Sequence, residues 1–524
     1  MSDAAPAPAA SDPPASDPPA YGGLRLALMT FALILAPLVQ VFDTSVVSIA
    51  LTQMQGSLSA TQDQVAWVLT SYLIAITITT PLWGALGGRF GRKPLLLISI
   101  AGFTVFSLLA GASQSLEEVL VHRFFQGVFG SALIPLAMSS LLSIYKREDF
   151  SIAMGWWGVG IMFGPVFGPT LGGYIAEYFS WRWAFYLNLP LGILAFTMVA
   201  LLIPRPGIRT NRPFNYFGFI MLAIALGGLQ FILDRGNRMD WFDSPMIITL
   251  ALISGAAFWL FMVNSFVSKT PFIDPGLFLD HNYLAGTVLR VLFGAVLFGS
   301  LVLLPPFLQK QGGYSLIDSA WILAPRGLGS MLGSMFIGRL IQIIDPRKMM
   351  GCGMVLTAYT MYALSTFTSD IDLTAVIIIC FFQGLAFSMF VIPVNTVAFS
   401  TLSPERRDLG TSFYSLLNNI GRTLGIAVLV TYFTYQAQAS RSVLRDHVNP
   451  FNDAVRHGLV PDAWAALNPT GLAVLNRVMV REAELIAYVT DFRVLAVAIL
   501  ICLPVVFIMN NPHAQKKTVA GETA

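Results

Sequence analysis

The chain has 524 residues, of which 55% are hydrophobic and only 11% are charged, whereas soluble domains carry about 25% charged residues. No soluble core can bury so much apolar surface, so the composition excludes a soluble globular protein and predicts an all-α integral membrane protein. The net charge of +3 is small, and the three cysteines all lie in apolar runs, so no disulfide framework is expected.

Taken in order, the chain begins with a polar stretch, 1–24, that we predict to be a disordered cytoplasmic tail and not a signal peptide. Apolar runs then predict fourteen membrane-spanning helices. Six form an N-terminal bundle (25–204), at 27–50, 65–86, 94–113, 118–143, 152–174 and 183–204. Two form an inserted hairpin (205–268), at 214–233 and 246–267. Six form a C-terminal bundle (269–512), at 284–308, 319–341, 350–368, 373–399, 411–435 and 492–511, and a cytoplasmic tail follows at 513–524.

The distribution of basic residues predicts the orientation of the chain in the membrane. With the N-terminus in the cytoplasm, the inner loops hold thirteen Lys and Arg residues: Arg89, Arg92, Lys93, Lys146, Arg147, Arg205, Arg209, Arg212, Lys269, Arg347, Lys348, Arg406 and Arg407. The short outer loops then hold four: Arg182, Arg235, Arg238 and Lys310. Because cytoplasmic loops are enriched in Lys and Arg, both termini are expected in the cytoplasm.

The two predicted bundles also share sequence. The run FFQG occurs at 124–127 and again at 381–384, and a basic loop at 84–93 resembles another at 338–348. Repeats at this spacing indicate two equivalent bundles, so Gln126 and Gln383 are expected at equivalent positions facing the cavity between them. The long outer segment 436–491 ends in a helix-like run at 475–488. It is either a docking surface for a partner or a tolerated surface insertion.

Several motifs together resemble the major facilitator superfamily, and in particular its fourteen-span drug:proton antiporters of the EmrB type. They are VFDT (41–44), WVLTSY (67–72), GALGGRFGRK (84–93), GIMFGPVFGPTLGG (160–173), WRWAFYLNLPLG (181–192), LQFILDRGNRMDWFDS (229–244) and VNPF (448–451). The resemblance implies the major facilitator fold, with no cofactor, and a periplasmic adaptor (membrane fusion) protein and an outer-membrane channel as partners. The cytoplasmic loop motif consists of Gly84, Arg89, Gly91, Arg92 and Lys93. Its acid position is occupied by Gly88, which puts the family's cytoplasmic lock in doubt, and Asp345 in the second copy does not clearly replace it.

Asp43 and Arg123 are the predicted centre of proton coupling. An acid and a cation within apolar spans are costly and therefore functional by default. Burial favours the neutral form of Asp43, while a nearby arginine favours its charged form, so the group can exchange a proton. The alternative interpretation is a fixed structural ion pair.

Other polar and aromatic residues at suitable helical positions are candidates for the substrate cavity. They are Gln40, Trp67, Tyr72, Gln126, Gln383, Phe390, Asn395, Tyr414, Asn418 and Arg422. Arg290 and Arg326 are interpreted as structural, with Arg326 satisfying a carbonyl freed by Pro325. For Arg422 a structural and a functional role stay open.

Small residues at helical spacing in the fifth predicted span allow close helix packing, which the antiporter motif is expected to use against proton leak. The motif residues are Gly160, Gly164, Pro165, Gly168, Pro169, Gly172 and Gly173.

No metal-binding or nucleotide-binding motif was found, so we expect a transporter that uses no metal and is not an enzyme. The sequence favours proton-driven efflux of amphipathic compounds across a bacterial inner membrane. Alternatives are a narrow-specificity exporter of a metabolite, siderophore or fatty acid, a passive uniporter, and a membrane sensor or scaffold.

Overall fold

The structure, a computed structural model, describes residues 21–204, 213–368, 372–403, 406–447 and 469–509. These residues form helices and connections without any strand, which confirms the all-α prediction. Among them, twelve helical segments are long and apolar enough to cross a bilayer. The predicted spans at 319–341 and 350–368 are also helical, but they are more polar, so the count of fourteen spans stays a prediction.

The N-terminal part of the chain forms eight helices. They are α1 (Gly23–Ser57), α2 (Gln62–Phe90), α3 (Arg92–Ala112), α4 (Leu116–Gly130), α5 (Leu133–Ile144), α6 (Phe150–Tyr178), α7 (Trp183–Tyr186) and α8 (Asn188–Leu202). A capping box begins α2, because Thr61 and Gln64 each bond the other's backbone N–H. The predicted span 118–143 is divided between α4 and α5, and residues 23 and 24 of the predicted tail already belong to α1.

The rest of the described chain forms eight further helices. They are α9 (Tyr216–Arg235), α10 (Pro245–Val267), α11 (His281–Lys310), α12 (Leu316–Leu340), α13 (Pro346–Leu364), α14 (Leu373–Ser400), α15 (Arg407–His447) and α17 (Pro469–Ile508). Short 3₁₀ turns lie at Arg147–Asp149, Gly236–Met239, Trp241–Asp243 and Pro275–Leu277. The predicted boundaries at 204 and 269 fall between helices, and the division into bundles there stays a prediction.

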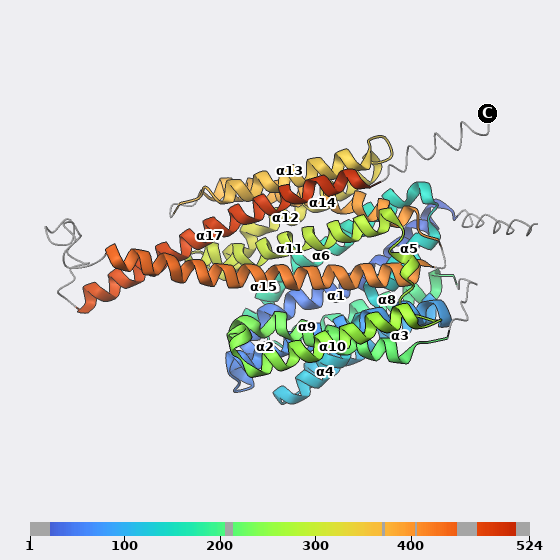
Figure 1. Cartoon of the computed structure of the whole chain (residues 1–524), viewed down its shortest axis with the longest axis horizontal. Helices are drawn as coiled ribbons and strands as arrows, with labels where there is room; N and C mark the ends of the chain where they lie inside the picture. Colours follow the sequence, from blue (N-terminus) through green and yellow to red (C-terminus); the bar gives the residue numbers. More distant parts are fainter. Residues whose placement is uncertain (1–20, 205–212, 369–371, 404–405, 448–468, 510–524) are drawn as a thin grey trace, which may run out of the picture.

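The helices run roughly parallel to one long axis (Figure 1). At one end, called the basic end below, α1 begins, α17 ends, and α2 connects to α3 through the basic loop motif (Figure 1). At the opposite end, the far end, α15 and α17 project beyond the other helices. The helix-like run predicted at 475–488 is confirmed as part of α17. The prediction of a loop was wrong for 436–447, 469–474 and 489–491, which extend these two helices, and VNPF at 448–451 lies outside the described residues.

Glycines bring helices of the two parts together near the basic end. A Cβ placed on Gly338 of α12 would lie 3.2 Å from the Cα of Gly155 on α6, and one on Gly158 would lie 2.6 Å from the Ser334 hydroxyl oxygen. Side chains larger than hydrogen at these positions would push the helices apart. The sequence therefore permits a close crossing of α6 and α12.

The hairpin α9–α10 contacts both parts of the molecule through α9 and the turn that follows it. The hydroxyl group of Thr77 on α2 donates to Gln230 Oε1 at 3.2 Å, and Gln230 Nε2 donates to the Thr423 hydroxyl on α15 at 3.3 Å. After α9, Trp241 Nε1 donates to the Thr431 hydroxyl, also on α15, at 3.2 Å. The inserted hairpin is thus tied to α2 and α15 together.

Candidate functional site

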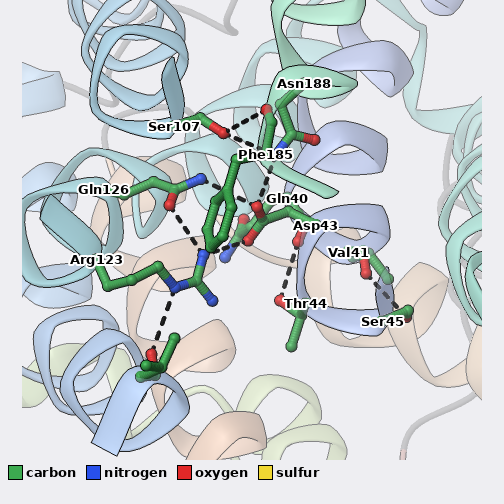
Figure 2. A network of polar contacts seen from close by, with 11 residues as sticks. Gln40, Val41, Asp43, Thr44, Ser45, Ser107, Arg123, Gln126, Phe185 and Asn188 are labelled. Carbon is green, nitrogen blue, oxygen red and sulfur yellow. Dashed lines mark hydrogen bonds and ion pairs between the residues drawn. The ribbon is translucent and has the colours of Figure 1, made fainter. Parts of the chain in front are cut away.

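A buried ion pair lies at the centre of the N-terminal helices. Asp43 on α1 accepts a hydrogen bond from Arg123 Nη1 on α4 at 2.7 Å, and both side chains have 0% exposure. Gln126, one turn beyond Arg123, accepts from the same Nη1 at 2.9 Å and donates its own Nε2 to Asp43 Oδ1 at 3.1 Å (Figure 2). The acid, the cation and the amide that the sequence singled out therefore meet in one network.

Two further helices complete this network. Asn188, the first residue of α8, donates Nδ2 to Asp43 Oδ1 at 2.6 Å and also to the Ser107 hydroxyl on α3 at 3.0 Å. The Ser107 hydroxyl in turn donates to the backbone carbonyl of Phe185 at 2.9 Å (Figure 2). The Asp43 carboxylate on α1 thus receives donors from Arg123 and Gln126 on α4 and from Asn188 on α8, while α3 joins the network through Ser107 and Asn188.

This arrangement can respond to a single proton. The carboxylate form of Asp43 accepts three hydrogen bonds, one of them from a cation, whereas the protonated form is neutral and turns one oxygen into a donor. Protonation therefore removes the charge that Arg123 neutralises. A fully buried guanidinium without its partner is strongly unfavourable, so its side chain would have to move or find another acceptor.

The guanidinium of Arg123 also lies against aromatic rings. Its central carbon is 4.0 Å from the centroid of the Tyr72 ring and 5.5 Å from that of Phe185. Its Nη2 atom is buried without a hydrogen-bond partner. The side chain of Tyr72 also interacts with those of Gln40 and Thr44, so the predicted cavity residues Tyr72 and Gln40 lie beside the ion pair.

The glycines of the antiporter motif pack α6 against α1. A Cβ on Gly160 would lie 1.9 Å from Ile34 Cγ2, one on Gly164 would lie 2.8 Å from Val41 Cγ1, and one on Gly168 would lie 2.5 Å from Ser45 Cβ. On the next turn, a Cβ on Gly172 would lie 3.2 Å from the Cα of Val46. Pro165 is half-buried and Gly173 is buried in the same helix, while the side chain of Pro169 is outside the described set. The α1 segment in contact includes the residues on either side of Asp43.

The loop motif lies against the start of α15. Arg92 donates Nε to Asp408 Oδ1 at 2.6 Å, and the hydroxyl of Ser139 on α5 donates to the same oxygen. A Cβ on Gly84 would lie 2.4 Å from the Ser412 hydroxyl oxygen, so glycine is required for this approach. Asp408 of α15 thus forms an ion pair with Arg92 of the cytoplasmic loop motif, in which Gly88 occupies the acid position.

The other loop-motif residues have separate structural roles. Gly91 has φ of +88°, in the region that favours glycine, and it forms the turn between α2 and α3. Lys93 donates Nζ to the carbonyls of Ala200 at 2.7 Å and Ile203 at 2.6 Å, which satisfies the C-terminal end of α8. Arg89 is exposed beside Phe90.

In the C-terminal helices, four of the predicted cavity residues are buried among their neighbours. Gln383 on α14 is fully buried, and its Nε2 donates a hydrogen bond to the sulfur of Met361 at 3.7 Å. Phe390 stacks on Phe293, with ring centroids 3.8 Å apart. The hydroxyl of Tyr414 donates to Asn395 Oδ1 at 2.6 Å.

Three arginines in the C-terminal spans have no acidic partner among the described residues. Arg326 donates to the Leu297 carbonyl at 3.5 Å and to the Ser300 hydroxyl at 3.3 Å, both on α11, and not to a carbonyl of its own helix as predicted. Arg422 lies 4.4 Å from the Phe298 ring centroid, and Arg290 lies 6.0 Å from that of Phe387.

Trp67 does not join the other cavity candidates. Its ring packs against Phe231 of α9 at a centroid distance of 5.6 Å, and the guanidinium of Arg235 lies 4.7 Å from its centroid. Arg235 also donates to the carbonyl of Asp63, and Thr70 donates to Asp234. Trp67 therefore belongs to the contact between α2 and the inserted hairpin.

Sequence reasoning missed three polar residues with prominent positions. Asn188 was only part of a motif, although an amide between apolar residues was a usable signal. Asp408 lies three residues before the predicted span 411–435, and Asp491 lies one residue before the predicted span 492–511. In the structure Asp491 has 0% exposure within α17, and neither of its carboxylate oxygens has a hydrogen-bond partner.

Comparisons with known proteins agree with this architecture. Residues 33–302 and 286–440 match the family model described as Major Facilitator Superfamily. The chain is 33% identical over 432 residues to the multidrug export protein EmrB of Escherichia coli strain K12, covering 82% of this chain and 84% of that protein. It is 30% identical over 497 residues to the fatty acid resistance protein FarB of Neisseria gonorrhoeae, covering 94% and 97% respectively.

A solved structure, that of the human organic anion transporter MFSD10, covers 90% of this chain and 99% of its own, with a TM-score of 0.60. The sequence identity of 12% means that this likeness concerns the fold alone. The family match and the two relatives extend over most of the chain. The chain therefore belongs to the Major Facilitator Superfamily, as a relative of the EmrB proteins.

Proposed function

We propose that this membrane protein exports amphipathic compounds in exchange for protons. The observation that carries the proposal is the fully buried network of Asp43 with Arg123, Gln126 and Asn188. An ionisable acid held this deeply among apolar helices is a functional group by default. The relatives named as a multidrug export protein and a fatty acid resistance protein support efflux of apolar or amphipathic molecules.

In this proposal, Asp43 is charged in one stage of transport and protonated in another. The charged acid holds Arg123 and three neighbouring helices in the arrangement described above. Protonation from the outer side releases Arg123, and this loosens the contact among α1, α3, α4 and α8. The N-terminal bundle (25–204) then tilts relative to the C-terminal bundle (269–512), with the inserted hairpin (205–268) bridging them.

The contacts at the basic end support alternating access. Arg92, Ser139 and Asp408 join α3 and α5 to α15, and Arg407 donates to the Leu142 carbonyl at 3.2 Å. These contacts hold the two bundles together at one end, which is the arrangement expected of a transporter closed on that side. We propose that this end is cytoplasmic, that both termini lie in the cytoplasm and that the membrane is the bacterial inner membrane.

We also propose a tripartite assembly with a periplasmic adaptor and an outer-membrane channel. Its support is the projection of α15 and α17 beyond the other helices at the far end (Figure 1). Arg441 and Asn476 join these two helices by a hydrogen bond of 3.0 Å, so the projection is a paired structure. It offers an adaptor a surface outside the membrane.

Expression in cells that lack their own efflux pumps tests the proposed function. Cells producing the native protein should resist several unrelated amphipathic compounds, while cells producing Asp43→Asn at equal membrane abundance should not. Resistance to a single metabolite or siderophore would instead favour the narrow-specificity alternative. Equal resistance with the native and variant proteins would contradict a role for Asp43.

A further inference from the structure

An acid of α17 is buried without any polar partner. Asp491 has 0% exposure, and neither of its carboxylate oxygens has a hydrogen-bond partner within the described residues. Asp43, the other acid with 0% exposure in the described part of the chain, receives three donors, one of them from a cation. The two buried acids thus have opposite surroundings, and the transport cycle proposed above uses only Asp43.

The helix around Asp491 packs into an apolar core between α11 and α15. Phe492, the next residue, and Tyr488, one turn before, both contact the Phe307 ring of α11, at centroid distances of 6.0 and 5.3 Å. On the other side, the Phe433 ring of α15 lies 4.5 Å from that of Tyr488. Asp491 therefore belongs to a part of α17 that is enclosed by aromatic side chains of two neighbouring helices.

The cations of the neighbouring helices lie at other levels. Lys310 of α11 is paired with Glu484 of α17 at 2.9 Å, two turns from Asp491 toward the far end. Arg290 of α11 and Arg422 of α15 lie nearer the basic end, by about five turns from Phe307 and about three turns from Phe433 respectively.

The remaining titratable groups near this level have partners or face outward. On α17 itself, Arg493 is exposed and lies about 200° around the helix axis from Asp491. Tyr359 and Tyr362 of α13 are exposed, and the hydroxyl of Tyr432 on α15 accepts a hydrogen bond from Gln436 at 2.7 Å. Within the described chain, Asp491 is thus left without a counter-ion.

A carboxylate in such a place cannot keep its charge. Moving an isolated ionised carboxylate into an apolar environment costs far more free energy than moving a neutral polar group, so the carboxylate takes up a proton instead. The neutral carboxyl needs no cation beside it. Asp43, which is bonded to Arg123, does not have this requirement.

The far end offers the nearest exit for a proton on Asp491. Glu484, Tyr488 and Asp491 follow one another at a spacing of four and three residues, which places them on one face of α17. Glu484 is partly exposed, whereas Tyr488 and Asp491 are buried. Around Glu484, the ion pair with Lys310 and the hydrogen bond of 2.7 Å from Arg481 to the Gln311 carbonyl hold α17 against the end of α11.

We propose that Asp491 is a second proton-binding site of this protein, separate from the Asp43 network and filled in the structure described. Its proton allows α17 to pack against α11 and α15. When the O–H bond of the carboxyl breaks, the proton passes to water at the far end, and the remaining carboxylate must itself reach water, so α17 separates from α11. The inference goes beyond the proposed export function, because neither proton binding nor this separation requires a substrate.

Infrared spectroscopy of the purified chain in nanodiscs tests whether Asp491 holds a proton. A protonated carboxyl has a carbonyl band distinct from that of a carboxylate, and isotopic labelling of aspartate distinguishes it from a glutamic acid. The native chain should show this band in neutral buffer and lose it as the pH is raised. Asp491→Asn should lack the band, whereas Asp63→Asn, which removes an acid with an 80% exposed side chain, should keep it.

Distances between spin labels at Leu301 of α11 and Ile486 of α17 test the separation of these helices. Both residues are exposed, and the three native cysteines are replaced first. Raising the pH should lengthen this distance in the native chain over the range in which the infrared band disappears. In Asp491→Asn, which is always neutral, the distance should stay short, and Asp491→Glu should restore the response to pH.

Three results would overturn the inference: no protonated aspartic acid in the native chain at neutral pH, a band of full strength in Asp491→Asn, or a distance that lengthens equally with pH in that variant. If Asp491→Asn does not fold, the native chain decides, because a change in the band or in the distance without the other contradicts the inference. Failure of the proposed function is a different result. If the band and the distance behave as expected but no amphipathic compound is exported, the proton site stands and the export function fails.

Discussion

At the scale of single residues, the stability of the network depends on the mutual neutralisation of Asp43 and Arg123. Both side chains are fully buried, so removing one of them leaves an uncompensated charge. We expect Arg123→Met to lower the free energy of unfolding by about 3–5 kcal/mol, and the double variant with Asp43→Asn to recover part of that loss. Thermal unfolding of the purified proteins in one detergent measures this. A double variant as unstable as Arg123→Met would show that charge pairing is not the cause.

Residues of this network could be predicted where a charge or amide interrupts an apolar run. Asp43, Arg123 and Gln126 gave that signal, and the structure places them together. The sequence could not show that Asn188 also reaches Asp43, because its partner depends on the packing of α8 against α1. The interpretation of Arg290 as structural stays a prediction, and its guanidinium carbon lies 6.0 Å from the centroid of the Phe387 ring.

At the scale of helices, the crossing of α6 and α1 depends on glycine. A Cβ on Gly164 would already come within 2.8 Å of Val41, so a leucine side chain cannot be accommodated without separating the helices. We expect Gly164→Leu to abolish export while the protein still inserts into the membrane. Gly255→Leu on α10 is the matched control, because nothing lies within 4 Å of a Cβ there.

Drug resistance of cells, with membrane abundance measured in parallel, decides this prediction. The control variant should support native resistance. Normal resistance with Gly164→Leu would mean that α6 and α1 need not pack closely for transport. If neither Gly164→Leu nor Gly255→Leu were found in the membrane, the loss would reflect leucine in place of glycine in any membrane helix and not the contact between α6 and α1.

The ion pair between Arg92 and Asp408 should hold the basic end closed. Its side chains are only 10% and 8% exposed, so removing one partner costs several kcal/mol, enough to shift a two-state equilibrium about tenfold or more. We expect Asp408→Asn to populate a conformation open at this end. The exchange Arg92→Asp with Asp408→Arg should restore part of the closed population.

Distances between spin labels at Phe90 and Ile343 report this equilibrium. Both residues are exposed and lie at the basic end, on α2 and after α12, and the three native cysteines are replaced first. A longer distance should appear in Asp408→Asn and decrease in the exchanged pair. An unchanged distance distribution in Asp408→Asn would rule out a locking role.

Helix positions could largely be predicted because span length and apolarity are set by the bilayer. Composition could not reveal how far α15 and α17 continue. Residues 436–447 and 469–474 are polar and were predicted to belong to a loop, yet they continue α15 and begin α17, whereas the helix-like run at 475–488 was predicted. The ion pair between Arg92 and Asp408 could not be predicted either, because the two residues are 316 positions apart in sequence.

At the scale of the whole molecule, the projecting ends of α15 and α17 should be needed for assembly and not for substrate binding. Arg441 and Asn476 are hydrogen-bonded, so a short Gly-Ser linker can replace residues 442–475 without separating the helices. The contacts of Lys310 with Glu484 and of Gln311 with Arg481 are kept. We expect the purified variant to bind substrate normally while cells that produce it lose resistance. Loss of binding would indicate misfolding, and full resistance would make the projection dispensable.

The central claim is that a proton carried by Asp43 drives export, and it is tested most directly in proteoliposomes with an imposed pH gradient. Native protein should concentrate a fluorescent amphipathic substrate against its own gradient, and collapse of the pH gradient should stop this accumulation. Asp43→Asn keeps the size and hydrogen bonding of the side chain but fixes its neutral state, so we expect only downhill equilibration. Uphill accumulation by Asp43→Asn at the native level would contradict the account, because the proton would then be carried elsewhere.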